Sequence, residues 1–295
     1  MKKMKFVRLG ASLYVPANRN DLAAIANRTK YPQLRSVIFC TEDSLKEKDV
    51  PAALDNLAET LRVLEANDRL LRFIRVRNPK VLGRCLQMDG ISKIDGFVLP
   101  KVTRHNIDTY WSQFNETDRF DVMPTLEMPD FFDMNEMLLF RELLLHESYK
   151  KRILSLRIGG NDLLNHLRLR RLVANTIYST PIRTTIAMMA TTFIPAGFNL
   201  TGPVFEALND ATTLSREVME DMQHGLLGKT AIHPDHVAII ENHYQVGRQD
   251  MEMAEAILDK NAPAVFGMHG QMCEPSTHIN WAKLIIERAR EFGVL

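Results

Sequence analysis

Eight short apolar runs alternate with helical patterns along the 295 residues of the chain. Most are rich in β-branched or aromatic residues and are bounded by turn residues, as is typical of strands. The runs cover residues 12–16, 36–40, 71–76, 96–102, 121–127, 153–158, 193–199 and 228–234. Strands that alternate with helices form parallel βαβ units. Eight such units predict an α/β protein with a closed (β/α)₈ barrel, the TIM barrel, and an open doubly wound sheet is the alternative.

Helical patterns fill the intervals between these runs, and a further segment follows the last of them. The helices are expected at residues 21–27, 54–64, 79–89, 105–114, 134–144, 181–190, 213–224 and 234–260. Residues 1–261 are therefore predicted to form a catalytic barrel domain, and residues 262–295 a C-terminal loop and helix. The last helix has an apolar face. It either packs on its own barrel or crosses to a neighbouring subunit as a lid.

The composition excludes several classes of protein. The formal net charge of +1 gives no general attraction to nucleic acid or to a membrane surface. Cys40, Cys85 and Cys273 are far apart and form no CxxC pair, which argues against a zinc ribbon or a disulfide scaffold and fits the reducing cytoplasm. No apolar run reaches the ~18 residues of a membrane span. Arg8 and Gly10 interrupt the apolar stretch at the N-terminus, so a signal peptide is not expected.

Two of the strand-like runs end in a carboxylate beside turn residues. Glu127 precedes Pro129 closely, and Asp162 follows Gly159 and Gly160. If the two runs are neighbouring parallel strands, their ends lie about 5 Å apart. The two carboxylates could then share one divalent cation, Mg²⁺ or alternatively Mn²⁺, because such hard cations take oxygen ligands. The alternative is that both are helix N-caps or loop acids.

Other polar residues also fall at the C-terminal ends of the predicted strands, where the active site of a (β/α)₈ barrel lies. Arg75 is a candidate clamp for a substrate carboxylate, and the alternative is a structural ion pair with Glu42 or Asp43. Lys101 is either a substrate-binding residue or part of a salt bridge at the barrel mouth. The remaining residues of this ring are Asn18, Arg19, Asn199 and His233; Arg19 is a second candidate for substrate binding, and His233 is more typical of a helix cap.

Several segments together resemble the citrate lyase β-subunit and HpcH–HpaI aldolase family over nearly the whole chain. The segments are Leu13-Tyr14-Val15-Pro16-Ala17-Asn18-Arg19, Thr41-Glu42-Asp43, Arg75-Val76-Arg77, Val98-Leu99-Pro100-Lys101-Val102, Gly228-Lys229-Thr230-Ala231-Ile232-His233-Pro234 and Gly270-Gln271-Met272-Cys273-Glu274-Pro275. The sequence is most similar to a divergent branch of these lyases that is associated with tellurium-resistance gene clusters. The resemblance implies that Glu127 and Asp162 are the metal ligands.

The resemblance also implies a reaction. A Mg²⁺-dependent carbon–carbon lyase of the aldol or Claisen type would act on a 2-oxo or 3-hydroxy acid or its acyl-CoA thioester, with the cation stabilising the enolate. Arg75 would bind the substrate carboxylate, and Glu42 and Asp43 would orient Arg75 or water. Glu274, from a neighbouring subunit of a trimer or hexamer, is the candidate general base.

The sequence departs from the family pattern at four places. Cys40 and Asn161 replace acids, Asn199 falls near an expected aspartate, and Glu274 replaces an aspartate of the lid. A non-catalytic ligand-binding barrel that keeps the metal site is therefore one alternative. A metal barrel enzyme acting on phosphoenolpyruvate-type substrates is another.

Overall fold

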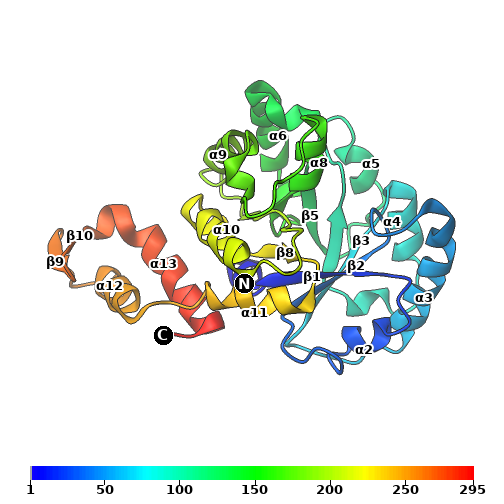
Figure 1. Cartoon of the computed structure of the whole chain (residues 1–295), viewed down its shortest axis with the longest axis horizontal. Coiled ribbons are helices and arrows are strands. Elements are labelled where there is room, and N and C mark those ends of the chain that lie inside the picture. Colours follow the sequence, from blue (N-terminus) through cyan, green and yellow to red (C-terminus); the bar gives the residue numbers. More distant parts are fainter. Residues whose placement is uncertain (1) are drawn as a thin grey trace.

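The computed structural model describes residues 2–295, with side chains from residue 5 onward, and it contains a barrel of eight parallel strands (Figure 1). The strands follow one another in the order β7-β6-β5-β4-β3-β2-β1-β8, and a parallel bridge between Gly202 and Lys229 joins the two ends of the sheet. The strands are β1 (Ala11–Pro16), β2 (Ser36–Cys40), β3 (Leu71–Arg75), β4 (Gly96–Leu99), β5 (Asp121–Leu126), β6 (Leu156–Ile158), β7 (Leu200–Thr201) and β8 (Lys229–Ala231). This architecture confirms the predicted TIM barrel.

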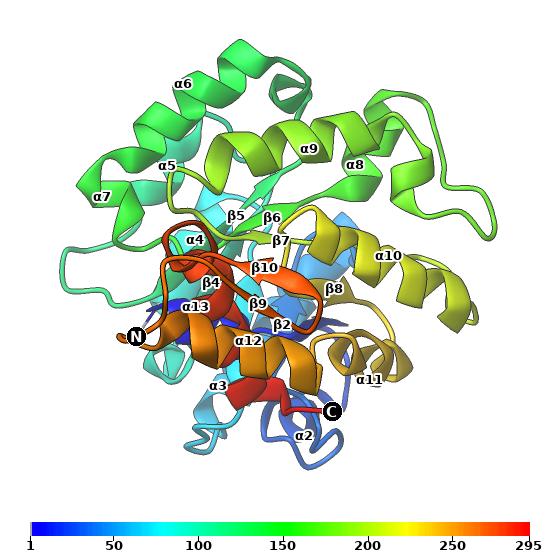
Figure 2. The same cartoon turned by 90° about the vertical axis from the view of Figure 1, so that its left-hand side faces the viewer.

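Helices follow the strands and cover the outside of the barrel (Figures 1 and 2). The first one precedes β1 and was not expected from the sequence. They are α1 (Lys2–Val7), α2 (Leu22–Ala26), α3 (Val50–Arg62), α4 (Pro79–Leu86), α5 (Ile107–Trp111), α6 (Met134–Leu145), α7 (Glu147–Lys150), α8 (Gly160–His166), α9 (Ile182–Phe193), α10 (Ala211–Gln223) and α11 (Pro234–Asn242). None of the helices in residues 2–295 combines the length and apolar character needed to cross a membrane.

Side-chain caps fix where several of these helices begin. The carboxamide of Asn78 accepts a hydrogen bond from the N–H of Val81 at 2.9 Å, and Pro79 occupies the first turn of α4. Asp133 caps α6 and Asp210 caps α10 in the same manner. Each cap satisfies backbone donors that the helix itself leaves free, so the turns between strands and helices are defined locally.

The region of the seventh strand differs from the prediction. Phe193 and Ile194 continue the buried face of α9 instead of opening a strand, and Pro195 lies just beyond the end of that helix. Strand β7 contains only Leu200 and Thr201. Asn199 therefore precedes the strand, and its carboxamide donates to the carbonyl of Leu154 at 3.3 Å. The prediction that Asn199 ends the seventh strand is wrong.

The predicted helix over residues 234–260 is two helices, because the chain turns between Tyr244 and Gly247. The second, α12 (Arg248–Leu258), pairs with the long α13 (Pro275–Phe292), and a hairpin of β9 (Phe266–Met268) and β10 (Gln271–Cys273) connects them. We call residues 246–295 the arm. It has its own small apolar cluster, and it projects from the side of the barrel (Figures 1 and 2).

The arm contacts its own barrel mainly at its base. The rings of Tyr244 and Phe292 meet at 5.3 Å between centroids, and the guanidinium of Arg35 lies 4.8 Å from the Phe292 centroid. Farther out, Trp281 and Leu284 of α13 and Met272 of β10 remain exposed. The expectation that α13 buries its apolar face is thus met only in part within one chain, against α12.

A buried ionic cluster ties β8 to α10. Lys229, which is completely buried, donates to Glu217 at 2.9 Å and to Asp221 at 2.7 Å. The hydroxyl of Tyr178 donates to the other oxygen of Asp221 at 2.7 Å, and Arg171 pairs with Glu217 at 3.0 Å. Burial, together with the charge of Glu217, raises the pKa of Asp221 to about 6 although Lys229 opposes the shift. The side chain of Arg171, the last residue of the basic segment His166-Leu167-Arg168-Leu169-Arg170-Arg171, is therefore buried, with 5% exposed.

Candidate active site

Glu127 follows β5 directly and is the most deeply buried carboxylate of the barrel mouth, with 1% of its surface exposed. The backbone N–H of Lys101, at the end of β4, donates to its Oε1 at 2.7 Å. Lys101 adopts the left-handed conformation with φ 54°, which is uncommon for a residue with a side chain. Such strain persists only where the surroundings fix it, and here it directs the N–H at Glu127.

The turn between β6 and α8 lies against the other side of Glu127. A Cβ atom at Gly159 would lie only 2.2 Å from Glu127 Oε2, so the close approach requires a glycine. Asp162 lies in the first turn of α8 and lines the same cavity as Glu127. Burial, with the charge of Asp162 adding to it, raises the pKa of Glu127 to about 7, while Arg75 opposes the shift. The two carboxylates therefore share one electrostatic environment.

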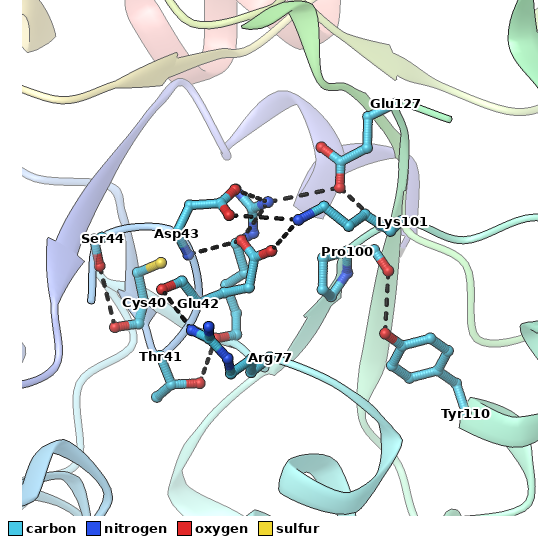
Figure 3. Close-up of polar contacts among 11 residues, drawn as sticks. Cys40, Thr41, Glu42, Asp43, Ser44, Arg77, Pro100, Lys101, Tyr110 and Glu127 are labelled. Carbon is cyan, nitrogen blue, oxygen red and sulfur yellow. Dashed lines mark hydrogen bonds and ion pairs between the residues drawn. The ribbon is translucent and has the colours of Figure 1, made fainter. Parts of the chain in front are cut away.

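Arg75 and Lys101 both pair with Glu42 and Asp43, the two acids that follow β2. Figure 3 shows Lys101 beside both acids. Arg75 Nη2 lies 2.7 Å from Glu42, 3.0 Å from Asp43 and 3.6 Å from Glu127. Lys101 Nζ donates to Glu42 at 2.8 Å and lies 3.4 Å from Asp43. The ion pairs considered as alternatives for Arg75 and Lys101 are therefore present. They place Nη2 of Arg75 among three carboxylates.

The charges of this network set the protonation of its two acids in opposite directions. Burial raises the pKa of Glu42, and its hydrogen bond with Asp43 adds to the shift. Burial also acts to raise the pKa of Asp43, but the hydrogen bond with Glu42 and the charges of Arg75 and Lys101 together lower it. The pKa of Glu42 therefore lies above that of Asp43.

A cavity of about 260 Å³ opens at this end of the barrel. Glu127, Asp162, Arg75 and Asp43 line it, together with Tyr14, Cys40, Thr125 and Arg157. The ring of Tyr14 lies near two guanidinium groups, 5.9 Å from Arg75 and 5.5 Å from Arg157. Arg157 is not among the site residues predicted from the sequence. A charged residue between the apolar Leu156 and Ile158 of a strand was the available signal.

Glu42 and Lys101 do not line this cavity themselves but pair with Arg75 and Asp43, which do. Three other residues of the predicted ring and lid lie away from it. Arg19 pairs with Asp21 at 2.8 Å on the surface. Glu274 lies on the arm, where its carboxylate accepts from the hydroxyl of Ser276 at 2.9 Å, so one chain alone does not bring it to the cavity. His233 is the N-cap of α11, as its position before Pro234 indicates.

The donor set at the mouth fits a divalent cation. The carboxylates Glu42, Asp43, Glu127 and Asp162 outnumber Arg75 and Lys101, the two cations among them, so a dication would offset the excess negative charge of this acidic group. Two carboxylate ligands leave positions for water and substrate, as Mg²⁺ sites usually do. A second acidic group, His105, Asp130 and Glu136, lies on the surface, and Arg104 already pairs with Glu136 at 2.5 Å.

Comparison with known proteins places the chain in a family. Residues 3–294 match the model of the C-C bond lyase family of the TIM-barrel fold. The chain belongs to this family. The match identifies the chain as a carbon–carbon lyase and confirms the resemblance to citrate lyase β-subunits. A search of curated protein sequences finds no match.

Solved structures share the fold at low sequence identity. The protein CitE from Mycobacterium tuberculosis, in complex with magnesium, acetoacetate and coenzyme A, is 20% identical, with a TM-score of 0.67 over 96% of this chain and 98% of that chain. RipC from Yersinia pestis is 16% identical, with a TM-score of 0.58 over 79% and 93% of the two chains. Malate synthase from Haloferax volcanii, a magnesium and glyoxylate complex, is 12% identical, with a TM-score of 0.66 over 78% and 73%.

Proposed function

We propose that this lyase is a cytoplasmic, Mg²⁺-dependent enzyme that cleaves or forms a carbon–carbon bond of a 2-oxo or 3-hydroxy acid, or of its acyl-CoA thioester. The observation that carries the proposal is that Glu127 and Asp162 open onto one cavity with Arg75. Magnesium together with small acids in the similar CitE and malate synthase structures supports the same reading. Mn²⁺ would satisfy the same oxygen ligands.

Different residues would bind the cation and the substrate carboxylate. Glu127 and Asp162 hold the cation, which would act as a Lewis acid toward the negative charge that develops on a substrate oxygen. Arg75 binds the substrate carboxylate; its Nε has no partner in the described structure. Glu42 and Asp43 keep Arg75 in place through their contacts with its Nη2. Lys101 pairs in turn with Glu42 and so supports it.

The acid–base residue is proposed to come from a second subunit. Glu274 lies on an arm that projects from its own barrel and leaves apolar side chains such as Trp281 exposed. In a homo-oligomer, a trimer or hexamer, the arm of one subunit would cover the cavity of the next. Closing the site excludes water and brings Glu274 to the substrate.

The size of the cavity bears on the substrate. Ligand pockets for drug-sized molecules span about 300–1,000 Å³, whereas this cavity measures about 260 Å³. A small acid fits such a volume. The nucleotide part of a coenzyme A thioester would therefore lie outside it, along the mouth or the covering arm.

Two measurements test the proposal on the full-length protein. Calorimetric titration with Mg²⁺ should show weaker binding to Glu127→Gln and to Asp162→Asn than to the native protein. Proton NMR in D₂O should show Mg²⁺-dependent exchange of the protons on the carbon that becomes the enolate. These are the methyl protons of pyruvate for an aldol-type lyase and the acetyl protons of acetyl-CoA for a Claisen-type lyase. Glu136→Gln is the control, because it removes a carboxylate from the surface cluster.

The outcomes separate the alternatives. Unchanged Mg²⁺ affinity in both site variants would remove the metal site. A native protein that binds Mg²⁺ together with pyruvate or acetyl-CoA but exchanges the protons of neither would support the non-catalytic ligand-binding barrel. A loss of Mg²⁺ binding in Glu136→Gln alone would move the metal to the surface cluster.

A further inference from the structure

Arg157 of β6 is a buried cation that the protein itself does not neutralise. Only 2% of its surface is exposed. Its Nη2 donates to the hydroxyl of Thr230 at 2.7 Å, and its Nη1 meets only the sulfur of Met123 at 3.8 Å. Its Nε has no partner, and no carboxylate among the described side chains lies within ion-pair distance of it. A buried charge without a counterion is costly, which calls for a reason why this one is present.

The strand register surrounds Arg157 with further unpaired polar groups. Thr125 of β5 and Thr201 of β7 are its direct partners on the two neighbouring strands. Residues paired in a sheet point to the same face. The buried hydroxyls of both threonines have no hydrogen-bond partner in the structure. One level of the barrel interior thus holds three donors without acceptors, although buried polar groups are nearly always paired.

This level belongs to the cavity. Arg157, Thr125 and Thr230 line it together with Arg75, and both arginines lie against the ring of Tyr14. The two guanidinium groups differ in one respect. Three carboxylates of the protein surround Arg75, whereas none pairs with Arg157. The charge of Arg157 is available to a ligand.

We propose that Arg157, with Thr125 and Thr230 beside it, binds a second anionic group of the substrate and so selects dicarboxylic acids over monocarboxylic ones. An arginine edge and hydroxyl donors match a carboxylate, which accepts several hydrogen bonds at once. The inference rests on the proposed function, since it assigns the first carboxylate to the cation and Arg75. Arg157 is then a specificity-determining residue and takes no part in bond cleavage.

The test compares two acids that differ only in the second carboxylate. Oxaloacetate carries it, and 2-oxobutyrate has a methyl group in its place. Dissociation constants are measured by calorimetry with Mg²⁺ for the native protein, Arg157→Met and Arg157→Lys. Arg152→Met is the matched control, because Arg152 is also buried but donates to the carbonyls of Asn115 and Asp118 away from the cavity.

We expect Arg157→Met to weaken oxaloacetate binding by roughly 10- to 100-fold, the value of a hydrogen bond to a charged group, and to leave 2-oxobutyrate binding unchanged. Arg157→Lys should fall between the two. A native protein that binds neither acid would refute the proposed function and this inference together. Binding of both acids with the same preference in the native protein and in Arg157→Met would refute the inference alone.

The melting temperature without ligand distinguishes a ligand-binding arginine from one that stabilises the fold. Removing an unpaired buried charge should leave the melting temperature of Arg157→Met unchanged or raise it, whereas Arg152→Met should lower it because two carbonyls lose their donor. A lower melting temperature in Arg157→Met, combined with unchanged oxaloacetate affinity, would make Arg157 a structural residue.

Discussion

Gly159 is the residue on which the position of Glu127 depends most directly. In Gly159→Ala the new Cβ atom would lie 2.2 Å from Oε2 and 2.4 Å from Cβ of Glu127. Carbon atoms in contact normally stay about 3.5–4.0 Å apart. Because the Cβ of Glu127 cannot move away by side-chain rotation, the strand end or the turn must shift by about 1 Å. The conformation of Gly159 itself, φ −88°, is open to alanine, so the effect comes from the contact.

A shift of that size is large on the scale of a metal site. Distances from ligands to a metal are held to about ±0.2 Å, and misplacing a catalytic group by about 1 Å can reduce a rate roughly 100-fold. We therefore expect the Mg²⁺ dissociation constant to rise about 10- to 100-fold, as for lost support of a ligand. Overpacking should cost the fold about 1–3 kcal/mol.

Calorimetric Mg²⁺ titration and urea unfolding of the same preparations measure both effects. Gly83→Ala in α4 is the control: its Cβ would lie 2.5 Å from Gln113 Oε1, the mobile end of a side chain that can turn away. It should bind Mg²⁺ as the native protein does. Native Mg²⁺ affinity in Gly159→Ala would show that the turn does not position Glu127, and the reasoning about the metal site would be wrong.

Three further predictions concern binding, stability and assembly. Arg75→Lys keeps the charge but loses the fork, so pyruvate should bind about tenfold more weakly by calorimetry, by analogy with one lost charged hydrogen bond; equal affinity would contradict the clamp. Lys229→Met leaves two carboxylates buried without their cation and should lower the free energy of unfolding by about 3–5 kcal/mol at neutral pH. Since the pKa of Asp221 is already raised to about 6, the folded variant keeps a proton that the unfolded chain releases above about pH 4; the loss should therefore shrink as the pH is lowered from 8 to 5, and a pH-independent loss would contradict the ionic role. Mixing inactive Glu127→Gln with inactive Glu274→Gln should restore proton exchange if arms act in trans, whereas a protein that light scattering finds monomeric would exclude the shared site.

The barrel could be predicted from the sequence because its signal is local and repeated. Each unit pairs a short apolar run with a helix, and side-chain caps fix the start of several of these helices, as at Asn78 and Asp133. The seventh strand was misplaced because two residues, Leu200 and Thr201, are too few to show a pattern. The nearby Phe193 and Ile194, which belong to α9 and its end, gave the stronger apolar signal.

The site was predictable where a side chain lies at a strand end or in the turn that follows it, as for Arg75, Glu127 and Asp162. Glu127 and Arg75 meet at the mouth since the ends of parallel strands converge there. Arg19 lies after β1 but its side chain pairs with Asp21 on the surface. The sequence does not determine whether such a side chain points into the cavity or to a neighbouring acid. The role of Arg157 depends on the lack of a carboxylate beside it on the neighbouring strands. The sequence does not show this, because it requires the register of β5, β6 and β7, which pairs Arg157 with two threonines.

The departures of this chain from the family pattern bear on substrate charge as much as on turnover. Cys40 and Asn161 stand where the resemblance leads one to expect acids, and both line the cavity. Replacing two carboxylates by neutral groups makes the cavity less negative, and the unpaired Arg157 makes it more positive still. Glu127, Asp162 and Arg75, which the proposed chemistry needs, remain in place. A cavity altered in this direction favours a substrate with more negative charge, because Coulomb interactions in a buried site are only weakly screened. The substitutions therefore fit a lyase with a dianionic substrate better than a barrel that has lost its activity.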